Sequence, residues 1–198
     1  MADDGFINLP PGKIANVVTF LEMVARPHWI DSRDSQNSLT LRRDGQFDLN
    51  RYRALFRAIG DQWLWSSRLK YDDAELSHRI HDADTELFEV VVEDDIAGMV
   101  ELRRNTPQTI ELAFFGLKPD FTGRGLGRDV MHLTLQRAWA PATQKVWLHT
   151  CTFDHPAALK FYQRCGFRPS GFAVEIMDDP RLTGLLPKSA GPHIPLLE

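Results

Sequence analysis

The sequence predicts an α/β fold built on a mixed β-sheet. Two β-rich runs meet at an acidic turn, residues 93–95, which indicates an antiparallel hairpin. Further along the chain a strand, a helix and a second strand follow one another. This order predicts a parallel strand pair, because parallel strands need a long crossover connection, usually a helix. The 198 residues are enough for one domain with a buried core and a modest extension.

The first 37 residues are interpreted as an N-terminal extension or an added edge element of the sheet. Within them, residues 15–23 suit either a strand or a short helix. The predicted domain covers residues 38–178, and the Pro- and Gly-rich residues 179–198 predict an irregular tail. The expected elements of the domain are strand 38–43, a helix capped by Asp48 and ending near Gly60, helix 71–81, strands 86–92, 96–103 and 109–117, helix 125–138, strand 145–152, helix 156–165 and strand 172–177.

Composition argues against several classes of function. Lys and Arg number 23 against 27 Asp and Glu, and this net charge of -4 does not suit a nucleic-acid-binding protein. The acidic start and the lack of a long apolar run predict neither a signal peptide nor a membrane span. We therefore expect a cytoplasmic protein with no nucleic-acid or membrane partner. Cys151 and Cys165 fit no zinc or redox motif, so they predict free thiols and no metal site.

A glycine-rich turn lies between a predicted strand and a predicted helix. Gly123, Gly125 and Gly127 let the backbone approach a ligand closely, and the N–H groups at the helix start can bind a phosphate. Arg124 and Arg128 add positive charge beside them. A Walker loop would need Gly-Lys-Ser/Thr where this chain has Gly-Arg-Asp, and the glycine spacing is a poor match for a dinucleotide fingerprint. The turn therefore predicts an anion site of another kind.

Two segments resemble the GNAT acetyltransferases. Residues 117–127, LKPDFTGRGLG, are similar to the family's loop Q/R-x-x-G-x-G/A, which cradles the pyrophosphate of coenzyme A. Residues 154–167, DHPAALKFYQRCGF, are similar to its later motif N-x-x-A-x-x-x-Y followed by Gly-Phe. Thr122 replaces the usual Gln or Arg, and His155 replaces the usual Asn, unless a longer loop brings Asp154 to that position.

The resemblance implies a mostly antiparallel central sheet, with a parallel strand pair at the cofactor cleft and flanking helices. It also implies acetyl-CoA as the acyl donor, and an amine as the acceptor, either a small molecule or a protein amine. The implied cofactor-binding residues are Phe115, Gly116, Leu117, Gly123, Arg124, Gly125, Leu126, Gly127, Arg128 and His155. Gly116, three residues before Pro119, suggests a local splay that opens the cleft.

Three side chains are candidates for catalysis. By resemblance, Tyr162 is the acid that protonates the departing thiolate; its alternative role is packing between phenylalanines on an amphipathic helix. Glu111 is the leading candidate base, because it matches a family glutamate and stands in an apolar run that would raise its pKa. His149, on the next predicted strand, is its rival, since an imidazole titrates near neutral pH. Either base residue has the alternative of a purely structural role.

The acceptor pocket is harder to predict. The N-terminal helices carry Tyr52, Phe56, Trp63 and Trp65, and an aromatic stripe of this spacing usually belongs to a core. If either tryptophan lined the cleft, the acceptor would carry an apolar or a cationic group. The main alternative to an N-acetyltransferase is a non-catalytic acyl-CoA-binding regulatory module of the same fold. The sequence leaves the oligomeric state open, a homodimer included.

Overall fold

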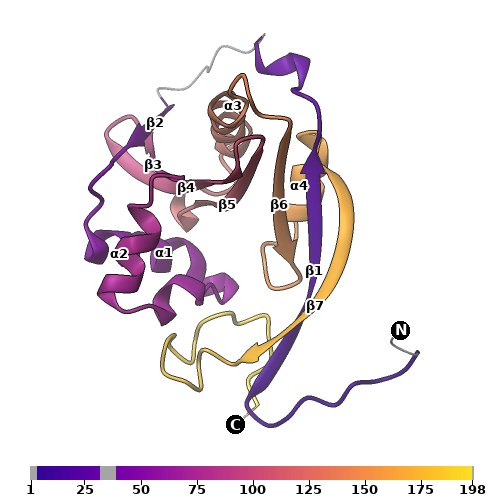
Figure 1. Ribbon diagram of the computed structural model, residues 1–198. Coiled ribbons are helices and arrows are strands. Elements are labelled where there is room, and N and C mark those ends of the chain that lie inside the picture. The colour runs from indigo at the N-terminus through magenta and orange to yellow at the C-terminus, as the bar shows by residue number, and fades with distance from the viewer. Residues whose placement is uncertain (1–3, 32–38, 198) are drawn as a thin grey trace.

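The computed structural model describes residues 4–31 and 39–197. Its centre is a seven-stranded sheet in the order β2-β3-β4-β5-β6-β1-β7 (Figure 1). Neighbouring strands are antiparallel except for β5 and β6, which are parallel. The strands are β1 Lys13–Met23, β2 Leu39–Arg43, β3 Thr85–Val92, β4 Asp95–Thr106, β5 Thr109–Leu117, β6 Lys145–Cys151 and β7 Arg168–Asp178. This arrangement confirms the predicted mixed, mostly antiparallel sheet with one parallel pair.

The α-helices are α1 Leu49–Gly60, α2 Asp73–Ile80, α3 Leu126–Ala138 and α4 Ala158–Arg164. Short 3₁₀ turns occupy His28–Ile30, Asp61–Trp63, Ser67–Lys70 and Pro119–Phe121. The carboxylate of Asp48 accepts a hydrogen bond from the backbone N–H of Arg51 at 2.8 Å, so it caps α1 as predicted. None of the helices within the described residues is both long and apolar enough to span a membrane.

Strand β1 lies inside the sheet, not at its edge. It pairs with β6 on one side and with β7 on the other, over most of its length. This position corrects the expectation that the N-terminal residues add an edge element. Hydrogen-bonding partners more than a hundred residues away decide the position of a strand, and the local sequence pattern does not contain them. The predicted boundary at residues 37 and 38 lies outside the described residues.

Helices cover both faces of the sheet (Figure 1). On one face, α1 and α2 pack on β3 and β4 around a core that includes Phe56, Leu76 and Met99. On the other face, α3 and α4 pack on the middle strands, and Leu135 and Leu148 are fully enclosed there. Burying a large apolar side chain stabilises the fold by roughly 1.5–3 kcal/mol, so these two cores supply most of the driving force.

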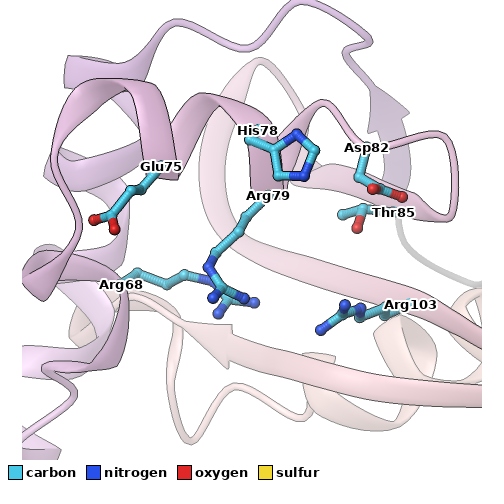
Figure 2. Close-up of a pocket in the computed structure, with 7 residues that line it drawn as sticks. All are labelled: Arg68, Glu75, His78, Arg79, Asp82, Thr85 and Arg103. Atoms are coloured by element: carbon cyan, nitrogen blue, oxygen red, sulfur yellow. The ribbon is translucent and has the colours of Figure 1, made fainter.

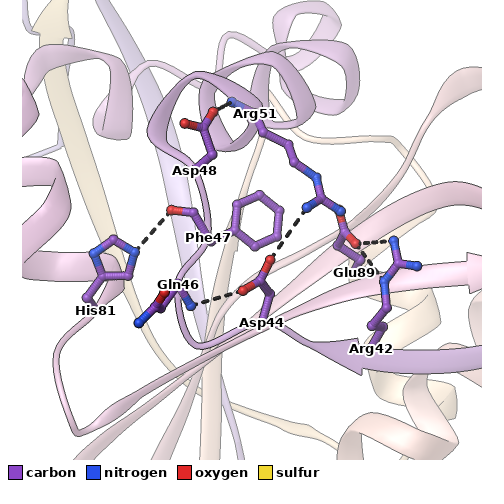
Figure 3. A network of polar contacts seen from close by, with 8 residues as sticks. All are labelled: Arg42, Asp44, Gln46, Phe47, Asp48, Arg51, His81 and Glu89. Atoms are coloured by element: carbon purple, nitrogen blue, oxygen red, sulfur yellow. Dashed lines mark hydrogen bonds and ion pairs between the residues drawn. The ribbon is translucent and has the colours of Figure 1, made fainter.

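A buried carboxylate fixes the start of α1 to the sheet. Glu89 on β3 has no exposed side-chain surface, and it accepts hydrogen bonds from Arg42 on β2 at 2.6 and 3.0 Å and from Arg51 on α1 (Figure 3). Arg51 also contacts Asp44 in the connecting loop at 3.5 Å. A buried carboxylate needs such partners, because an unpaired charge in the interior is strongly unfavourable.

The C-terminal residues 179–197 form turns that pack against the sheet end. Arg181, 4% exposed, pairs with Asp179 at 2.7 Å and donates to the backbone oxygens of Ile194 at 2.8 Å and Pro195 at 3.2 Å. Leu186 belongs to a small apolar cluster with Leu64 and Phe153. The tail therefore closes one end of the region between α1 and the ends of β6 and β7 (Figure 1).

Candidate active site

The parallel strands β5 and β6 separate after a short paired stretch. Among the described residues they pair only at Thr109–Glu111 and Lys145–Trp147. Immediately beyond Glu111 the register between β4 and β5 shifts, because Leu102 faces Leu112 while Glu101 faces Phe114. The residue left over, Ala113, makes a β-bulge, and a bulge bends its strand. Leu112 and residues 114–117 stay paired with β4, and the side of this stretch toward β6 is left open.

A cavity of about 960 Å³ lies along this opening. Its volume is at the upper end of the range for small-molecule sites. The predicted site residues that line it are Glu111, Phe115, Gly116, Leu117, Gly123, Gly125, Gly127, Arg128, His149, His155 and Tyr162. Two others do not: the guanidinium of Arg124 lies over the ring of Phe121 at 5.1 Å, and the side chain of Leu126 is buried in the core.

The glycine-rich turn has the backbone geometry of an anion site. Gly123 and Gly125 have φ of 78° and 80°, a left-handed conformation that side chains disfavour. A Cβ on either residue would meet no protein atom within 4 Å. Helix α3 begins directly after Gly125 without a side-chain cap, and the first N–H groups of a helix have no partner within it. Donors therefore cluster beside open space that Arg128 also lines.

Gly116 is required for packing. A Cβ at this position would lie 2.4 Å from Cγ2 of Ile59 and 3.1 Å from Cη2 of Trp65. The pairing of β5 with β6 already ends at Glu111, five residues earlier and next to the bulge, so the strand splay does not begin at Gly116 as predicted. The glycine instead lets α1 and Trp65 pack closely on β5.

Tyr162 lies on α4 beside the open stretch of β5. Its ring contacts Phe115, Phe161 and Phe167, with centroids 5.5–6.2 Å apart. Burial raises the pKa of the Tyr162 phenol above its ordinary value, and the nearby Asp154 carboxylate and Cys165 thiol raise it further. The side chain therefore combines the predicted aromatic packing with a hydroxyl that stays protonated at neutral pH.

Glu111 and His149 lie on the opposite face of the sheet from Tyr162. Glu111 pairs with Trp147, and His149 is two residues further along β6, so the three side chains point the same way. Leu148, between them, points into the core under α3. Glu111 is half-buried and accepts a hydrogen bond from Asn105 at 3.2 Å, whereas His149 is exposed. The candidate acid and the candidate bases thus border the opening from opposite sides.

Asp154 makes more contacts in the site than its neighbour His155. Its Oδ1 accepts from Nε1 of Trp65 at 3.1 Å, and its Oδ2 accepts from Oγ1 of Thr150 at 2.7 Å and from the backbone N–H of Cys151 at 2.9 Å. The carboxylate therefore ties the end of β6 to Trp65 across the cavity. His155 is exposed, and its Nδ1 bonds the backbone N–H of Ala157 at 3.0 Å.

The aromatic residues divide into two groups. Tyr52 and Phe56 are fully buried in the core, as predicted. Trp63 and Trp65 line the cavity. The ring of Trp63 lies between His155 and His193, with centroids 5.2 and 5.4 Å away.

Several cavity residues were not predicted from the sequence. Asn16 on β1 and Glu175 on β7 line the cavity although they are distant from the motifs in sequence. Arg68 lines it too and forms an ion pair with the buried Glu101, which also accepts a hydrogen bond from Tyr52 at 2.9 Å. No recognisable motif surrounds these residues, so only the strand pairing and helix packing reveal them.

A second cavity of about 320 Å³ lies behind Arg68, between α2 and the strands (Figure 2). Arg79 and Arg103 also line it, with Glu75 and Asp82 nearby. In the described part of the chain no group of three or more His, Cys, Asp or Glu residues could hold a metal ion.

Comparisons with known proteins agree with this geometry. The family described as "Acetyltransferase (GNAT) family" matches residues 52–167. A functionally unknown conserved protein from Staphylococcus epidermidis superimposes with a TM-score of 0.61 and 18% identity, over 85% of this chain and 63% of that one. This chain therefore spans less than two thirds of that protein. No curated protein sequence matches significantly.

Two structurally similar proteins contain ligands. A GNAT family acetyltransferase from Elizabethkingia anophelis with acetyl-CoA bound has a TM-score of 0.54 and 16% identity, over 69% of this chain and 80% of that one. A spermidine N-acetyltransferase from Vibrio cholerae in complex with CoA and spermine has a TM-score of 0.53 and 24% identity, over 68% of this chain and 83% of that one. At these identities the similarity shows a shared fold.

Proposed function

Because this chain belongs to the GNAT acetyltransferase family, we propose that it transfers an acetyl group from acetyl-CoA to a primary amine. The observation that carries the proposal is the separation of β5 and β6 after Glu111, which opens a cavity from the glycine-rich turn to the tryptophans before α2. A thioester placed in this gap could be approached by an amine from the opposite face of the sheet.

The residues present fit coenzyme A. The open side of residues 112–117 offers backbone groups to the amides of the pantetheine arm. The left-handed glycines leave space where side chains would otherwise lie, and the N-terminus of α3 favours the negative pyrophosphate. Arg128 supplies a positive charge at the same end.

Tyr162 is proposed to donate a proton to the sulfur as the amine displaces coenzyme A. The new amide bond forms between the amine nitrogen and the acetyl carbonyl carbon, and the bond from that carbon to sulfur breaks. The raised pKa of the phenol keeps its proton bound at neutral pH, so the hydroxyl is available as a hydrogen-bond and proton donor to the sulfur. Glu111 or His149, on the acceptor face, is proposed to take the proton that the amine loses.

Binding and turnover are tested separately. Calorimetric titration with acetyl-CoA is expected to show a single site, and a thiol-release assay on a panel of amines is expected to show turnover. The panel includes polyamines, since the similar V. cholerae protein was solved with spermine. Binding without turnover on any amine would favour the non-catalytic module, and absence of binding would exclude both functions.

Tyr162→Phe is expected to lower kcat by about 10²–10⁴-fold, because this is the usual contribution of a general acid. Its KM for acetyl-CoA should change little, since the aromatic packing is kept. Tyr71→Phe is the matched control: Tyr71 contacts Arg79 beside the other cavity and does not line the proposed active site. Equal kcat values for the two variants would remove Tyr162 from the mechanism.

A further inference from the structure

The cavity extends past β6 to a polar pair on the two strands beyond it. Asn16 on β1 faces Glu175 on β7, and both residues line the cavity. Asn16 is two residues from Val18, which faces Cys151, and Cys151 is two residues from His149. Because side chains two residues apart share a face, Asn16 and Glu175 lie on the same face as the candidate bases.

The Asn16 amide has an unsatisfied acceptor. The side chain is 97% buried (3% exposed), and its Nδ2 donates to Oε2 of Glu175 at 2.9 Å. A carboxylate can only accept, so this bond fixes the amide orientation and leaves Oδ1 as the other atom. Among the described residues, Oδ1 has no hydrogen-bond partner. A buried carbonyl oxygen without a partner is unfavourable, and here it belongs to a residue that lines a cavity.

The surroundings favour a positively charged group at this position. The carboxylates of Asp154 and Glu175 both raise the pKa of the Cys151 thiol, after the larger effect of its burial, so both act on the same region. Asp154 already accepts three hydrogen bonds, while Glu175 accepts only the one from Asn16 among the described residues.

The basic side chains that line the cavity belong to other elements. They are Arg103 on β4, Arg128 on α3, Lys70 in the 3₁₀ turn before α2, and Arg164 on α4. Arg68 is neutralised by Glu101. The region at Asn16 therefore offers acceptors and negative charge, which suit a group that only donates. A primary ammonium, with three N–H donors and a positive charge, has this chemistry.

We propose that Asn16 and Glu175 bind a second, protonated amino group of the acceptor, so that the preferred substrates are diamines or polyamines. The proposal rests on the proposed acetyl transfer. Phe20 on β1 faces His149, and Asn16 lies four residues further along the same strand, so the second amino group would lie about 14 Å from the backbone of His149. A long linear diamine or a triamine approaches this span, whereas a four-carbon diamine is too short.

Matched amines test the proposal. 1,8-Diaminooctane and octylamine have the same carbon chain, and only the diamine has the second amino group. We expect kcat/KM to be at least about tenfold higher for the diamine, which corresponds to about 1.4 kcal/mol. In Glu175→Gln, which keeps the size of the side chain and removes its charge, we expect the diamine-to-octylamine ratio to approach one. Glu22→Gln is the control, because Glu22 lies on β1, pairs with Lys145 and does not line the cavity; its ratio should stay at the wild-type value.

The outcomes separate the two proposals. If wild-type protein acetylates both amines with equal kcat/KM, or if Glu175→Gln keeps the wild-type ratio, the ammonium subsite is wrong and acetyl transfer stands. If acetyl-CoA binds but no amine is acetylated, the subsite is tested by binding alone, with calorimetry of 1,8-diaminooctane and of octylamine on CoA-loaded protein. Diamine binding that is lost in Glu175→Gln would then support the subsite, and no preference for the diamine would overturn it.

Discussion

Replacing Gly125 with alanine tests whether the glycine-rich turn binds coenzyme A. Gly125 has φ of 80° and precedes α3 directly. An L-residue in this conformation costs about 1–2 kcal/mol. Since 1 kcal/mol shifts the melting temperature of a protein of this size by roughly 2–4 °C, we expect Gly125→Ala to melt about 2–8 °C below wild type. A Cβ there meets no protein atom within 4 Å, so the variant should still fold.

The effect on binding should be larger than this strain suggests. The new Cβ would occupy the open space in which the pyrophosphate is proposed to lie. A hydrogen bond to a charged group contributes about 1.5–3 kcal/mol, so losing one such bond predicts a Kd for acetyl-CoA about 10- to 150-fold higher. Calorimetry measures the Kd, and circular dichroism verifies that the variant is folded.

Gly184→Ala is the matched control. Gly184 has φ of 78°, and a Cβ there also meets no protein atom within 4 Å, but the residue lies in the C-terminal tail and does not line the cavity. It should show the same loss of melting temperature and bind acetyl-CoA with the wild-type Kd. If Gly125→Ala and Gly184→Ala both bind with the wild-type Kd, the turn does not hold the cofactor and the reasoning fails.

Three further perturbations test other parts of the structure. Glu89→Ala would remove the charged hydrogen bonds from Arg42 and Arg51, whose own side chains are half-exposed, and urea unfolding should show a loss of about 1.5–3 kcal/mol; a loss below about 0.5 kcal/mol would contradict the network. The pKa of Cys151, raised to about 12, predicts slow alkylation by iodoacetamide at pH 8 in the folded protein. Because the unfolded thiol ionises near pH ~8.5, Cys151 should also lower stability as pH rises above that value, and Cys151→Ala should lessen this loss. Glu111→Gln and His149→Gln identify the base: the variant that loses the acidic limb of the kcat/KM profile carries it, and two unchanged profiles would exclude both residues.

Local signals in the sequence predicted much of the fold. Asp48 caps α1, and the β3–β4 hairpin lies where an acidic turn separates two β-rich runs, because caps and turns depend on residues close together in the chain. The glycine-rich turn was predictable for the same reason: only glycine readily adopts the left-handed conformation found at Gly123 and Gly125.

Tertiary structure decided how distant segments pair. Strand β1 lies inside the sheet, Asp154 accepts from Trp65 across the cavity, and Asn16 bonds Glu175 across 159 residues of sequence. The bulge at Ala113 lies next to the point where β5 and β6 stop pairing, although nothing in the local apolar run indicates it. Strand order and register depend on hydrogen bonds between segments that meet only after folding. The sequence alone therefore determined the elements and the motifs, and the pairing of the strands determined the shape of the cavity and the residues that line its acceptor side.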